Sequence, residues 1–583
     1  MESLRSHEYL VQTLEVPKGP RRAETERKPM DANNCVKTPL LKQSGGTGIP
    51  NPNVGYICTG YQCRLGKSQK RAMTWLGSHG EREDCSFADL DRESSKFANV
   101  LKGLNYSRGD VLFTYLPKIP THYFVLLGGL KQRLTMGPLF VNFGEEALLD
   151  RLADSKARGI VTRKVGLARL KHISDRLPSL QEIILVDSDQ HLADNILSYN
   201  LLMTDVTDDF EVPVTSPETP SLLHYTSGST GKPKGVLHCH GSLPSQQQTG
   251  QEVLQLSSDD IFWCTADPGW VTGTSYGIIS PWSLGVTQIH YGGGYDAQKW
   301  FEILEKEHVT IWYTAPTALR MLMREEERLL TKYDLSKLRY IFSVGEPLNP
   351  EAFFWGQRVL RKDIHDTWFQ TETGAIMIAN RPELEVRAGS MGKPVNEIQA
   401  EVVDERGEIL PVGKEGHLCL KPGWNSMFVA YLNRDEDYAK KFRHGWYWSG
   451  DLARRDREGY FWFVGRSDDV INTAGHLVSP FEVESALLEL PEVAESAAIG
   501  APDELFFEKV VAFVVLRPGI QWTKELELKI RLHVSNKVST TATPQDLVAV
   551  SEIPKNKSGK IMRRVLKANY LALDAGDLST LEI

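Results

Sequence analysis

Residues 224–242 read HYTSGSTGKPKGVLHCHGS, the most informative stretch of the chain. Its Ser, Thr and Gly residues leave backbone amides and hydroxyls unencumbered, and Lys232 and Lys234 follow, so the segment can wrap a polyphosphate. It is not a Walker A loop, because Pro233 follows Lys232 and the chain continues into the strand-like GVLH. A Ser/Gly-rich turn without a ligand is the alternative for any single loop of this composition.

Predicted strands alternate with predicted helices on both sides of this segment. SFADLDRESSKFANVLKGL (86–104) has helical spacing after a capping start, VLFTYLP (111–117) is a strand closed by proline, and THYFVLLGGLKQ (121–132) returns to helix. The alternation resumes later, with one helix expected over residues 317–330. Such alternation predicts βαβ units and buried, largely parallel sheets.

After about residue 423 the predicted pattern changes to short strands and turns. A compact stretch begins beyond residue 465. There the capping pattern Ser479-Pro480-x-Glu482 predicts the start of a helix, followed by two strands near 495–516 and a helix near 524–537. We therefore expect a polar, partly disordered arm over 1–50, a large α/β domain over 51–467 and a small α+β domain over 468–583.

The bulk properties exclude several classes of function. With 583 residues, the chain is longer than one hydrophobic core usually serves, so two or more domains are expected. Its net charge of -8 gives no basic field that would attract nucleic acid or an anionic membrane. The first residues lack the apolar core of a secretory signal, and the longest apolar runs fall far short of the roughly 20 residues that span a bilayer. Seven cysteines without metal-like spacing suit a reducing environment, so we expect a cytoplasmic protein.

YTSGSTGKPKG (225–235) resembles the phosphate-loop signature of the adenylate-forming enzymes, which include acyl-CoA synthetases, adenylation domains and luciferases. The resemblance covers roughly residues 50–570, and ADPGWVTGTSYG (266–277) with TWFQTETG is most similar to the AMP-forming acetyl-CoA synthetases and their short-chain relatives. It implies a large N-terminal α/β domain of stacked sheets with a distorted β-barrel, and a small mobile C-terminal α+β cap. The remaining matching motifs are GEPLNP (345–350), DTWFQTETG (366–374), YWSGD (447–451), GRSDDVINTAGH (465–476) and PKNKSGKIMRR (554–564).

The resemblance implies a nucleotide site that uses ATP and Mg²⁺. DTWFQTETG is too polar for a core strand, and within it Glu372 would hold the metal and Thr371 would bond the α-phosphate. Asp451 would accept from the ribose hydroxyls, with Arg466 as a fixed positive fork nearby. The loop expected to hold the β and γ phosphates contains Thr226, Ser227, Gly228, Ser229, Thr230 and Lys232, and the adenine would be framed by Gly345, Glu346, Pro347 and Asp366.

Lys560 resembles the catalytic lysine of the family, which polarises the carboxylate and phosphate during adenylation. The alternative from the residues alone is one more lysine in a basic run. Asp468 resembles a hinge about which the C-terminal domain swings, so that coenzyme A can approach through a tunnel lined near Gly475. Acetylation of Lys560 would remove its charge and is expected to block adenylation.

The acid pocket implied by the resemblance is lined by Val271, Thr272, Val344 and Phe369. Acetate specialists usually carry Trp at the last position, and Phe frees space on the order of a methylene or two, worth only ~1–3 kcal/mol of discrimination per methylene. We therefore expect a short-chain acid:CoA ligase acting on acetate, reversible in principle, with propionate and small branched acids as competitors.

Three alternatives stay open. The first is a medium-chain or aromatic acid:CoA ligase, which Phe369 leaves possible. The second is an adenylation module, which is opposed by the absence of a carrier domain before Ile583. The third is a non-catalytic nucleotide-binding descendant, which is opposed by the intact Glu372, Asp451 and Lys560. Two local features lack a functional role: the Lys-Gln-Arg run at 131–133, and the sequence His-Cys-His at 238–240, where buried strand residues are expected rather than a metal cluster.

Overall fold

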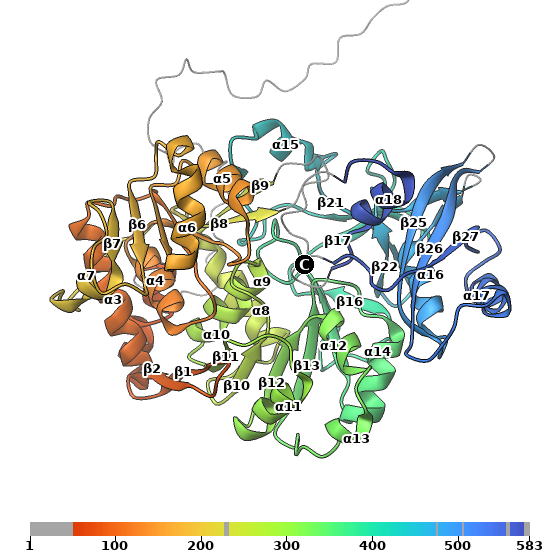
Figure 1. Ribbon diagram of the computed structural model, residues 1–583, viewed down its shortest axis with the longest axis horizontal. Helices are drawn as coiled ribbons and strands as arrows, with labels where there is room; N and C mark the ends of the chain where they lie inside the picture. Colours follow the sequence, from red (N-terminus) through yellow and green to blue (C-terminus); the bar gives the residue numbers. More distant parts are fainter. Residues whose placement is uncertain (1–50, 227–232, 474–475, 504–505, 556–559, 576–583) are drawn as a thin grey trace, which may run out of the picture.

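The computed structural model describes residues 51–226, 233–473, 476–503, 506–555 and 560–575 (Figure 1). The expected arm over 1–50 lies outside these residues. Three sheets organise the described chain, two in the large domain and one in the small domain. None of the helices in the described ranges is long and apolar enough to span a bilayer.

The first sheet has eight strands in the order β19-β9-β8-β4-β3-β5-β6-β7. It is parallel from β8 through β7, and antiparallel where β9 joins β8 and β19. The parallel strands are β3 (Val111–Tyr115), β4 (Thr135–Pro138), β5 (Gly159–Thr162), β6 (Glu182–Leu185), β7 (Ile196–Ser198) and β8 (Pro220–Thr226), and the antiparallel ones are β9 (Lys234–Cys239) and β19 (Ala430–Tyr431).

The second sheet is parallel in its central part and antiparallel toward the other domain. Its first part contains β1 (Arg71–Leu76), β2 (Arg82–Ser86), β10 (Ile261–Cys264), β11 (Thr287–Tyr291), β12 (Ile311–Thr314), β13 (Tyr340–Val344), β14 (Ile364–Trp368) and β15 (Ile378–Ala379). The antiparallel region, where the resemblance implies a distorted barrel, contains β16 (Ser390–Pro394), β17 (Ala400–Val403), β18 (Glu415–Leu420), β20 (Phe442–Arg443), β21 (Trp446–Arg455) and β22 (Phe461–Arg466).

Helices α3 (Phe87–Gly103) and α4 (Pro120–Lys131) lie between the two sheets. One core cluster joins Met73 of β1, Phe97 of α3, Leu126 of α4 and Leu112 of β3. Helix α4 is buried all round, as a helix between two layers must be. The predicted stacked α/β architecture is confirmed.

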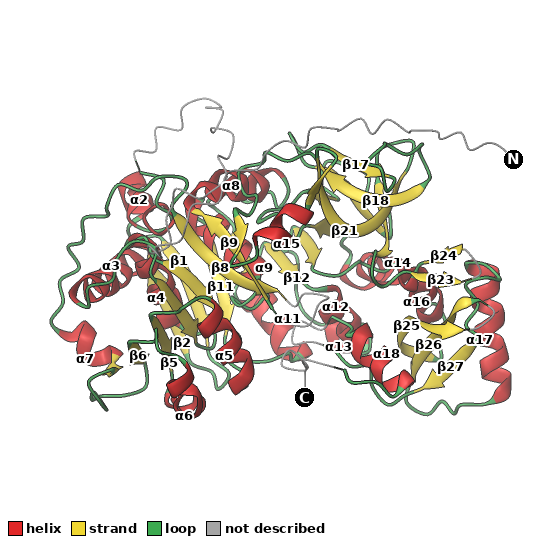
Figure 2. Cartoon of the chain, turned by 90° about the horizontal axis from the view of Figure 1, so that it is seen from above, coloured by secondary structure: helices red, strands yellow, loops and turns green. Residues whose placement is uncertain are grey.

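The small domain is a third, five-stranded sheet with helices packed against it (Figures 1 and 2). Helix α16 contacts β22 and the helix α14 (Pro350–Trp355) of the large domain, while α17 lies on the outer edge. The elements are β23 (Ile471–Thr473), β24 (His476–Val478), α16 (Pro480–Leu488), β25 (Val493–Asp503), β26 (Phe507–Leu516), α17 (Lys524–Lys537), β27 (Asp546–Ala549) and α18 (Arg563–Leu571).

Most local predictions are confirmed. Ser86 and Asp89 form a reciprocal capping box at the start of α3, and the Ser479 side chain accepts from the Glu482 amide at 3.2 Å at the start of α16. The single helix expected over 317–330 is wrong: the chain forms α12 (Pro316–Leu322) and α13 (Glu327–Leu330). A start at Glu327 places a carboxylate in the first turn of α13, where the helix dipole favours it.

The basic run at 131–133 is structural. Lys131 is fully buried, and its Nζ donates to Asp91 Oδ1 at 2.6 Å, to the Asp91 carbonyl at 3.0 Å and to Ser95 Oγ at 2.8 Å. Three acceptors satisfy the three donors of the ammonium group, so Lys131 joins α4 to α3. Gln132 donates to the Tyr106 carbonyl at 3.1 Å.

Candidate functional site

The motif DTWFQTETG begins inside the second sheet. Asp366 to Trp368 end strand β14, and Asp366 and Thr367 are buried, so the expectation that this stretch is too polar for a core strand is wrong for its first three residues. Asp366 tolerates burial because its carboxyl accepts from Ser343 Oγ at 2.6 Å, while burial raises its pKa to about 7. The chain leaves the sheet at Phe369.

Asp451 is the meeting point of three donors. Trp368 Nε1 and Gln370 Nε2 both donate to its Oδ2 at 3.0 Å, and Arg466 Nη1 donates to its Oδ1 at 3.0 Å. Asp451 and Arg466 are cross-strand partners in β21 and β22. The carboxylate holds the pKa of Arg466 above its usual value, and the three donors fix Asp451 in one orientation.

Gln370 is itself fixed by the strand that carries Asp451. Tyr447 donates its hydroxyl proton to Gln370 Oε1 at 2.8 Å, and Gln370 Nε2 also donates to the Ser449 carbonyl at 3.1 Å. Every polar atom of the Gln370 side chain therefore bonds to β21. The motifs DTWFQTETG and YWSGD form one hydrogen-bonded unit.

Glu372 and Thr371 turn away from the sheet toward β19 and β9. Tyr431 donates its hydroxyl proton to Glu372 Oε1 at 2.6 Å, and His238 Nε2 donates to the Thr371 carbonyl at 2.7 Å. Burial and then Glu372 raise the pKa of Tyr431, which stays protonated as a donor. The half-buried Glu372 carboxylate suits a hard cation.

The rest of the site offers Mg²⁺ few protein ligands. Across the described ranges, no group of three or more His, Cys, Asp or Glu side chains is arranged to hold a metal. A single carboxylate completed by substrate phosphates is the usual arrangement for Mg²⁺, so the residues present fit this ion with bound nucleotide.

Lys560 lies among the charges of this site. Desolvation of its ammonium group is the main cause that lowers the pKa of Lys560, and the positive charge of Arg466 adds to it. The negative charges of Asp451 and Asp469 act in the opposite direction. The side chain remains accessible to solvent. The charges that act on Lys560 of the small domain therefore include Arg466 and Asp451 of the large domain, and Asp451 lies 109 positions earlier in the chain.

The segment after β13 carries the residues expected at the adenine. Gly345 has φ +92°, a conformation that glycine adopts without strain, and the Glu346 carboxylate binds Arg320 and accepts from Thr317 Oγ1 at 2.7 and 2.9 Å. Pro347 is half-buried. The carboxyl of Asp366 bonds to Ser343 within the sheet. Among the four residues expected at the adenine, Asp366 is therefore the one placed to support the segment after β13.

Two of the residues expected to line the acid pocket pack with a residue that sequence reasoning did not single out, Tyr276. The ring of Phe369 meets the edge of Tyr276 with centroids 5.4 Å apart, and both belong to one apolar cluster with Val344. Val271 and Thr272 are buried in α9 (Val271–Thr274), one helical turn before Tyr276. Spacing of i and i+4 from Thr272 could have identified Tyr276.

The predicted phosphate-loop and coenzyme A residues fall largely outside the described part of the chain. Ser227, Gly228, Ser229, Thr230, Lys232 and Gly475 lie outside the described residues. Thr226, the first residue of the phosphate-loop segment (residues 226–232), ends β8, and the next described strand, β9, begins at Lys234. At the domain junction, Arg466 Nε donates to Asp468 Oδ1 at 3.4 Å.

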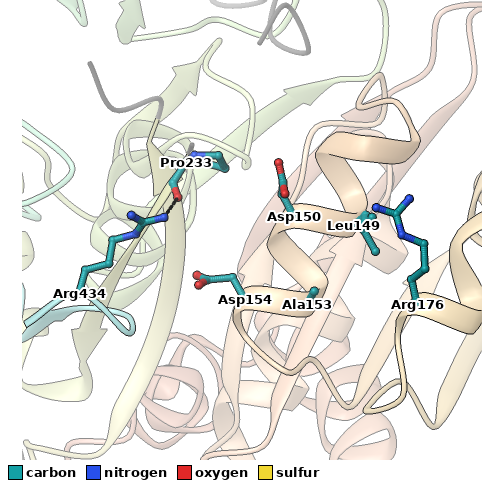
Figure 3. A pocket seen from close by; sticks show the side chains of 7 residues that line it. All are labelled: Leu149, Asp150, Ala153, Asp154, Arg176, Pro233 and Arg434. Carbon is teal, nitrogen blue, oxygen red and sulfur yellow. Dashed lines mark hydrogen bonds between the residues drawn. The ribbon is translucent and has the colours of Figure 1, made fainter. Parts of the chain in front are cut away.

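A cavity of about 410 Å³ is lined in part by Pro233, the residue that follows the phosphate-loop segment in the sequence (Figure 3). It lies between α5 (Glu145–Asp154) and the chain after β19. Arg434 Nη2 donates to the Pro233 carbonyl at 3.5 Å on one wall. The lining residues are Leu149, Asp150, Ala153, Asp154, Arg176, Pro233 and Arg434.

His238, Cys239 and His240 are buried, as predicted. His238 supports the Thr371 carbonyl, and His240 Nδ1 accepts from the Val54 amide at 3.0 Å. Burial lowers the pKa of His240 to about 3. These hydrogen bonds connect β9 and the turn after it to the segments that contain Thr371 and Val54.

Two family models match the chain. The model described as AMP-binding enzyme matches residues 62–432, and the model described as AMP-binding enzyme C-terminal domain matches residues 482–560. Among curated proteins, an acetyl-coenzyme A synthetase of Bacillus subtilis (strain 168) is 46% identical, with 86% of this chain and 87% of that protein covered. An acetyl-coenzyme A synthetase of Pyrobaculum aerophilum is 36% identical, with 95% and 88% covered.

Solved structures show the same fold. The anthranilate CoA ligase AuaEII in complex with anthranoyl-AMP is 28% identical with a TM-score of 0.81, covering 89% of this chain and 98% of that chain. An acyl-CoA synthetase of Brucella canis is 31% identical with a TM-score of 0.70, covering 89% and 94%. Both matches extend over the large and the small domain.

Proposed function

This chain belongs to the AMP-binding enzyme family, and from that premise we propose that it is an AMP-forming acetate:CoA ligase. In the first step a carboxylate oxygen of acetate attacks the α-phosphorus of ATP, and the bond to pyrophosphate breaks. In the second step the thiolate of coenzyme A attacks the carbonyl carbon of acetyl-AMP, AMP leaves with the bonding electrons, and the thiol proton passes to solvent. Both steps conserve charge and atoms and are reversible.

The observation that carries this proposal is the convergence of Trp368, Gln370 and Arg466 on Asp451. The charges of Arg466 and Asp451 also act on Lys560. A carboxylate held by three donors keeps lone pairs in a fixed direction for the two hydroxyls of a ribose. An ammonium group next to that position is placed to neutralise charge that develops at the α-phosphate and the attacking carboxylate.

The remaining nucleotide contacts follow from the same placement. We assign the β and γ phosphates to the phosphate-loop segment, the α-phosphate to Thr371 and the adenine to Gly345, Glu346 and Pro347, supported by Asp366. Glu372 would hold Mg²⁺, which neutralises charge between the phosphates when bound. Lys560 would supply the second positive charge.

Acetate is the preferred acid in this proposal because relatives of 36–46% identity over most of the chain are acetyl-coenzyme A synthetases. The acid would sit against Phe369, Val344, Val271 and Thr272, closed by Tyr276. An apolar pocket of this kind binds the methyl group and excludes water from the reacting carboxylate. Larger aliphatic or aromatic acids are not favoured.

Lys560 and the coenzyme A thiol must reach the same carbonyl region, so we propose that the domains 51–467 and 468–583 change their relative position between the two steps. Asp468, beside Arg466 at the junction, would be the hinge, and the chain near Gly475 would line the coenzyme A path. Acetylation of the Lys560 amine would remove its charge and stop the first step. We place the enzyme in the cytoplasm, which is consistent with the six described cysteines forming no disulfide.

The test is ATP–pyrophosphate exchange with a ladder of acids from C2 to C8 and with benzoate. The proposal expects exchange that is fastest with acetate and that falls along the ladder. Exchange that peaks with a medium-chain acid or benzoate would replace acetate by that acid, and no exchange with any acid would contradict an acid:CoA ligase.

A further inference from the structure

Glu495 of the small domain binds one cation from each domain, one with each of its carboxylate oxygens. Arg324 of the large domain, just after α12, binds Glu495 Oε1, and Lys555 of the small domain lies 2.7 Å from Glu495 Oε2. The side chains of Glu495 and Lys555 are only 14% and 19% exposed, whereas Arg324 is 38% exposed. We call this contact the Glu495 bridge (Arg324, Glu495, Lys555).

Lys555 stands at the base of the segment that carries Lys560. Lys555 and Ile561 form an isolated antiparallel bridge, and the Met562 amide donates to the Pro554 carbonyl at 2.9 Å. Ile561 directly follows Lys560. A side chain that anchors Lys555 therefore also restrains the neighbour of Lys560 across this bridge.

The charges of Arg324, Glu495 and Lys555 favour the contact between them. Burial raises the pKa of Glu495, but Lys555 and then Arg324 outweigh it, so the pKa is lower than usual and the carboxylate is ionised at neutral pH. A half-buried carboxylate with two cationic partners is worth more than an exposed surface pair, since less of its field is screened by solvent. Removing the carboxylate would also leave Lys555 near Arg324 with no anion between them.

The bridge crosses the domain boundary between residues that lie far in sequence from the junction at residues 467 and 468. Besides the bridge, Asn349 Nδ2 donates to Ser485 Oγ at 2.8 Å between α14 and α16. The bond from Asn349 carries no net charge, and neither partner lies near the Lys560 segment in the chain. Of these two contacts, the Glu495 bridge alone connects the large domain to the base of that segment.

We propose that Glu495 is a positioning residue for adenylation, which holds the Lys560 segment against the large domain through Arg324 and Lys555. The inference rests on the proposed function, because it concerns the half-reaction in which Lys560 acts. It further implies that the bridge belongs to the domain arrangement of the first step. The second step, which uses preformed acetyl-AMP and the coenzyme A thiol, does not depend on the bridge.

The experiment compares Glu495→Gln with wild type in the two half-reactions separately. We expect acetate-dependent ATP–pyrophosphate exchange to fall by about tenfold to a hundredfold, the range that a misplaced catalytic group costs. The fall should be in kcat rather than in the KM for ATP. Thioester formation from chemically prepared acetyl-AMP and coenzyme A should stay within about twofold of wild type, the scatter of a residue outside the step.

Matched variants separate positioning from folding. Glu492→Gln removes an ion pair of the same kind, since Glu492 Oε1 binds Lys529 at 2.6 Å within the small domain, and it should leave both half-reactions unchanged. Arg324→Gln should reproduce the exchange defect, and Arg324→Lys should restore most of the activity. The double variant Arg324→Gln/Glu495→Gln should be no slower than the slower single variant, because both changes break one contact.

Equal exchange rates for wild type and Glu495→Gln would overturn the inference while leaving the proposed function intact. Loss of both half-reactions in Glu495→Gln, or an Arg324→Lys protein as slow as Arg324→Gln, would show a structural role instead and also overturn it. If the wild type shows no acetate-dependent exchange, the proposed function fails first, and that result is distinguishable from the others.

Discussion

Gln370 donates a 3.0 Å hydrogen bond to Asp451, across the boundary between the parallel and antiparallel parts of one sheet. Trp368, two residues earlier, donates to the same oxygen. The aromatic and polar residues of DTWFQTETG are thus neighbours because alternate side chains serve the same carboxylate, while the residue between them, Phe369, faces Tyr276.

Replacing Gln370 by Leu should weaken the use of ATP. A hydrogen bond to a charged group is worth about 1.5–3 kcal/mol, so kcat/KM for ATP should fall by roughly tenfold to a hundredfold. Initial rates of pyrophosphate exchange at varied ATP measure this. Gln357→Leu is the control, because Gln357 makes a similar 2.8 Å bond to Asp363 on the exposed surface. An unchanged kcat/KM in Gln370→Leu would refute the role of this bond.

Phe369→Trp should restrict the enzyme toward acetate. The larger ring fills space next to Tyr276, so kcat/KM for propionate relative to acetate should fall by about tenfold or more, as expected for one methylene in an apolar pocket. The ratio is measured by competition between the two acids. If the ratio does not move, the wall of the acid pocket is not at residue 369.

Glu372→Gln should raise the Mg²⁺ concentration required for half-maximal exchange by about tenfold or more, because a neutral amide is a weaker ligand for a hard cation. A Mg²⁺ titration at fixed ATP measures this. Tyr431→Phe is the comparison: it removes the 2.6 Å bond to Glu372 but keeps the carboxylate, so its shift should be smaller. Identical Mg²⁺ curves for Glu372→Gln and wild type would contradict the metal assignment.

The domain interface should lose stability as the pH rises, through Glu351 of α14. Burial raises the pKa of Glu351 to about 7, with Glu489 of the small domain acting in the same direction and Lys537 opposing it. The folded protein therefore binds this proton more tightly than the unfolded chain, and stability falls between the ordinary pKa of about 4.3 and pH 7. Above pH 7 the full cost, about 3–4 kcal/mol, is present.

Glu351→Gln removes that cost, so it should raise the unfolding midpoint by a few degrees at pH 8 and by much less at pH 5. Calorimetric scans at the two pH values measure the difference. Glu146→Gln, on the exposed face of α5, should shift the midpoint equally at both. A larger gain at pH 5 than at pH 8 would show that Glu351 is charged in the folded protein.

Much of this arrangement could be predicted from the chain. Strand and helix periodicity identified the βαβ part, the Ser86/Asp89 and Ser479/Glu482 patterns located two helix starts, and motif order identified Asp451, Arg466 and Lys560. Those signals are local. Tyr431 was missed because its partner Glu372 lies 59 positions away, and no periodicity spans such a separation, whereas Tyr276 lies one helical turn after Thr272 and could have been identified from that spacing.

Burial also reversed one local expectation and explained one feature that had no assigned role. Asp366 lies in a core strand because its carboxyl accepts a hydrogen bond from a hydroxyl of the neighbouring strand. Lys131 lies inside the protein because Asp91 and Ser95 accept hydrogen bonds from its ammonium group. The division of 317–330 into two helices depends on α13 starting anew at Glu327. Each of these features depends on tertiary partners that sequence patterns alone do not reveal.

Acetate-dependent ATP–pyrophosphate exchange by Lys560→Ala, measured beside wild type, tests the central claim most directly. The account predicts that wild type exchanges with acetate and that Lys560→Ala loses at least about a hundredfold of the rate, since a charge at the reacting phosphate is removed. The same variant should still form acetyl-CoA from acetyl-AMP. A Lys560→Ala protein that exchanges at the wild-type rate would contradict the account.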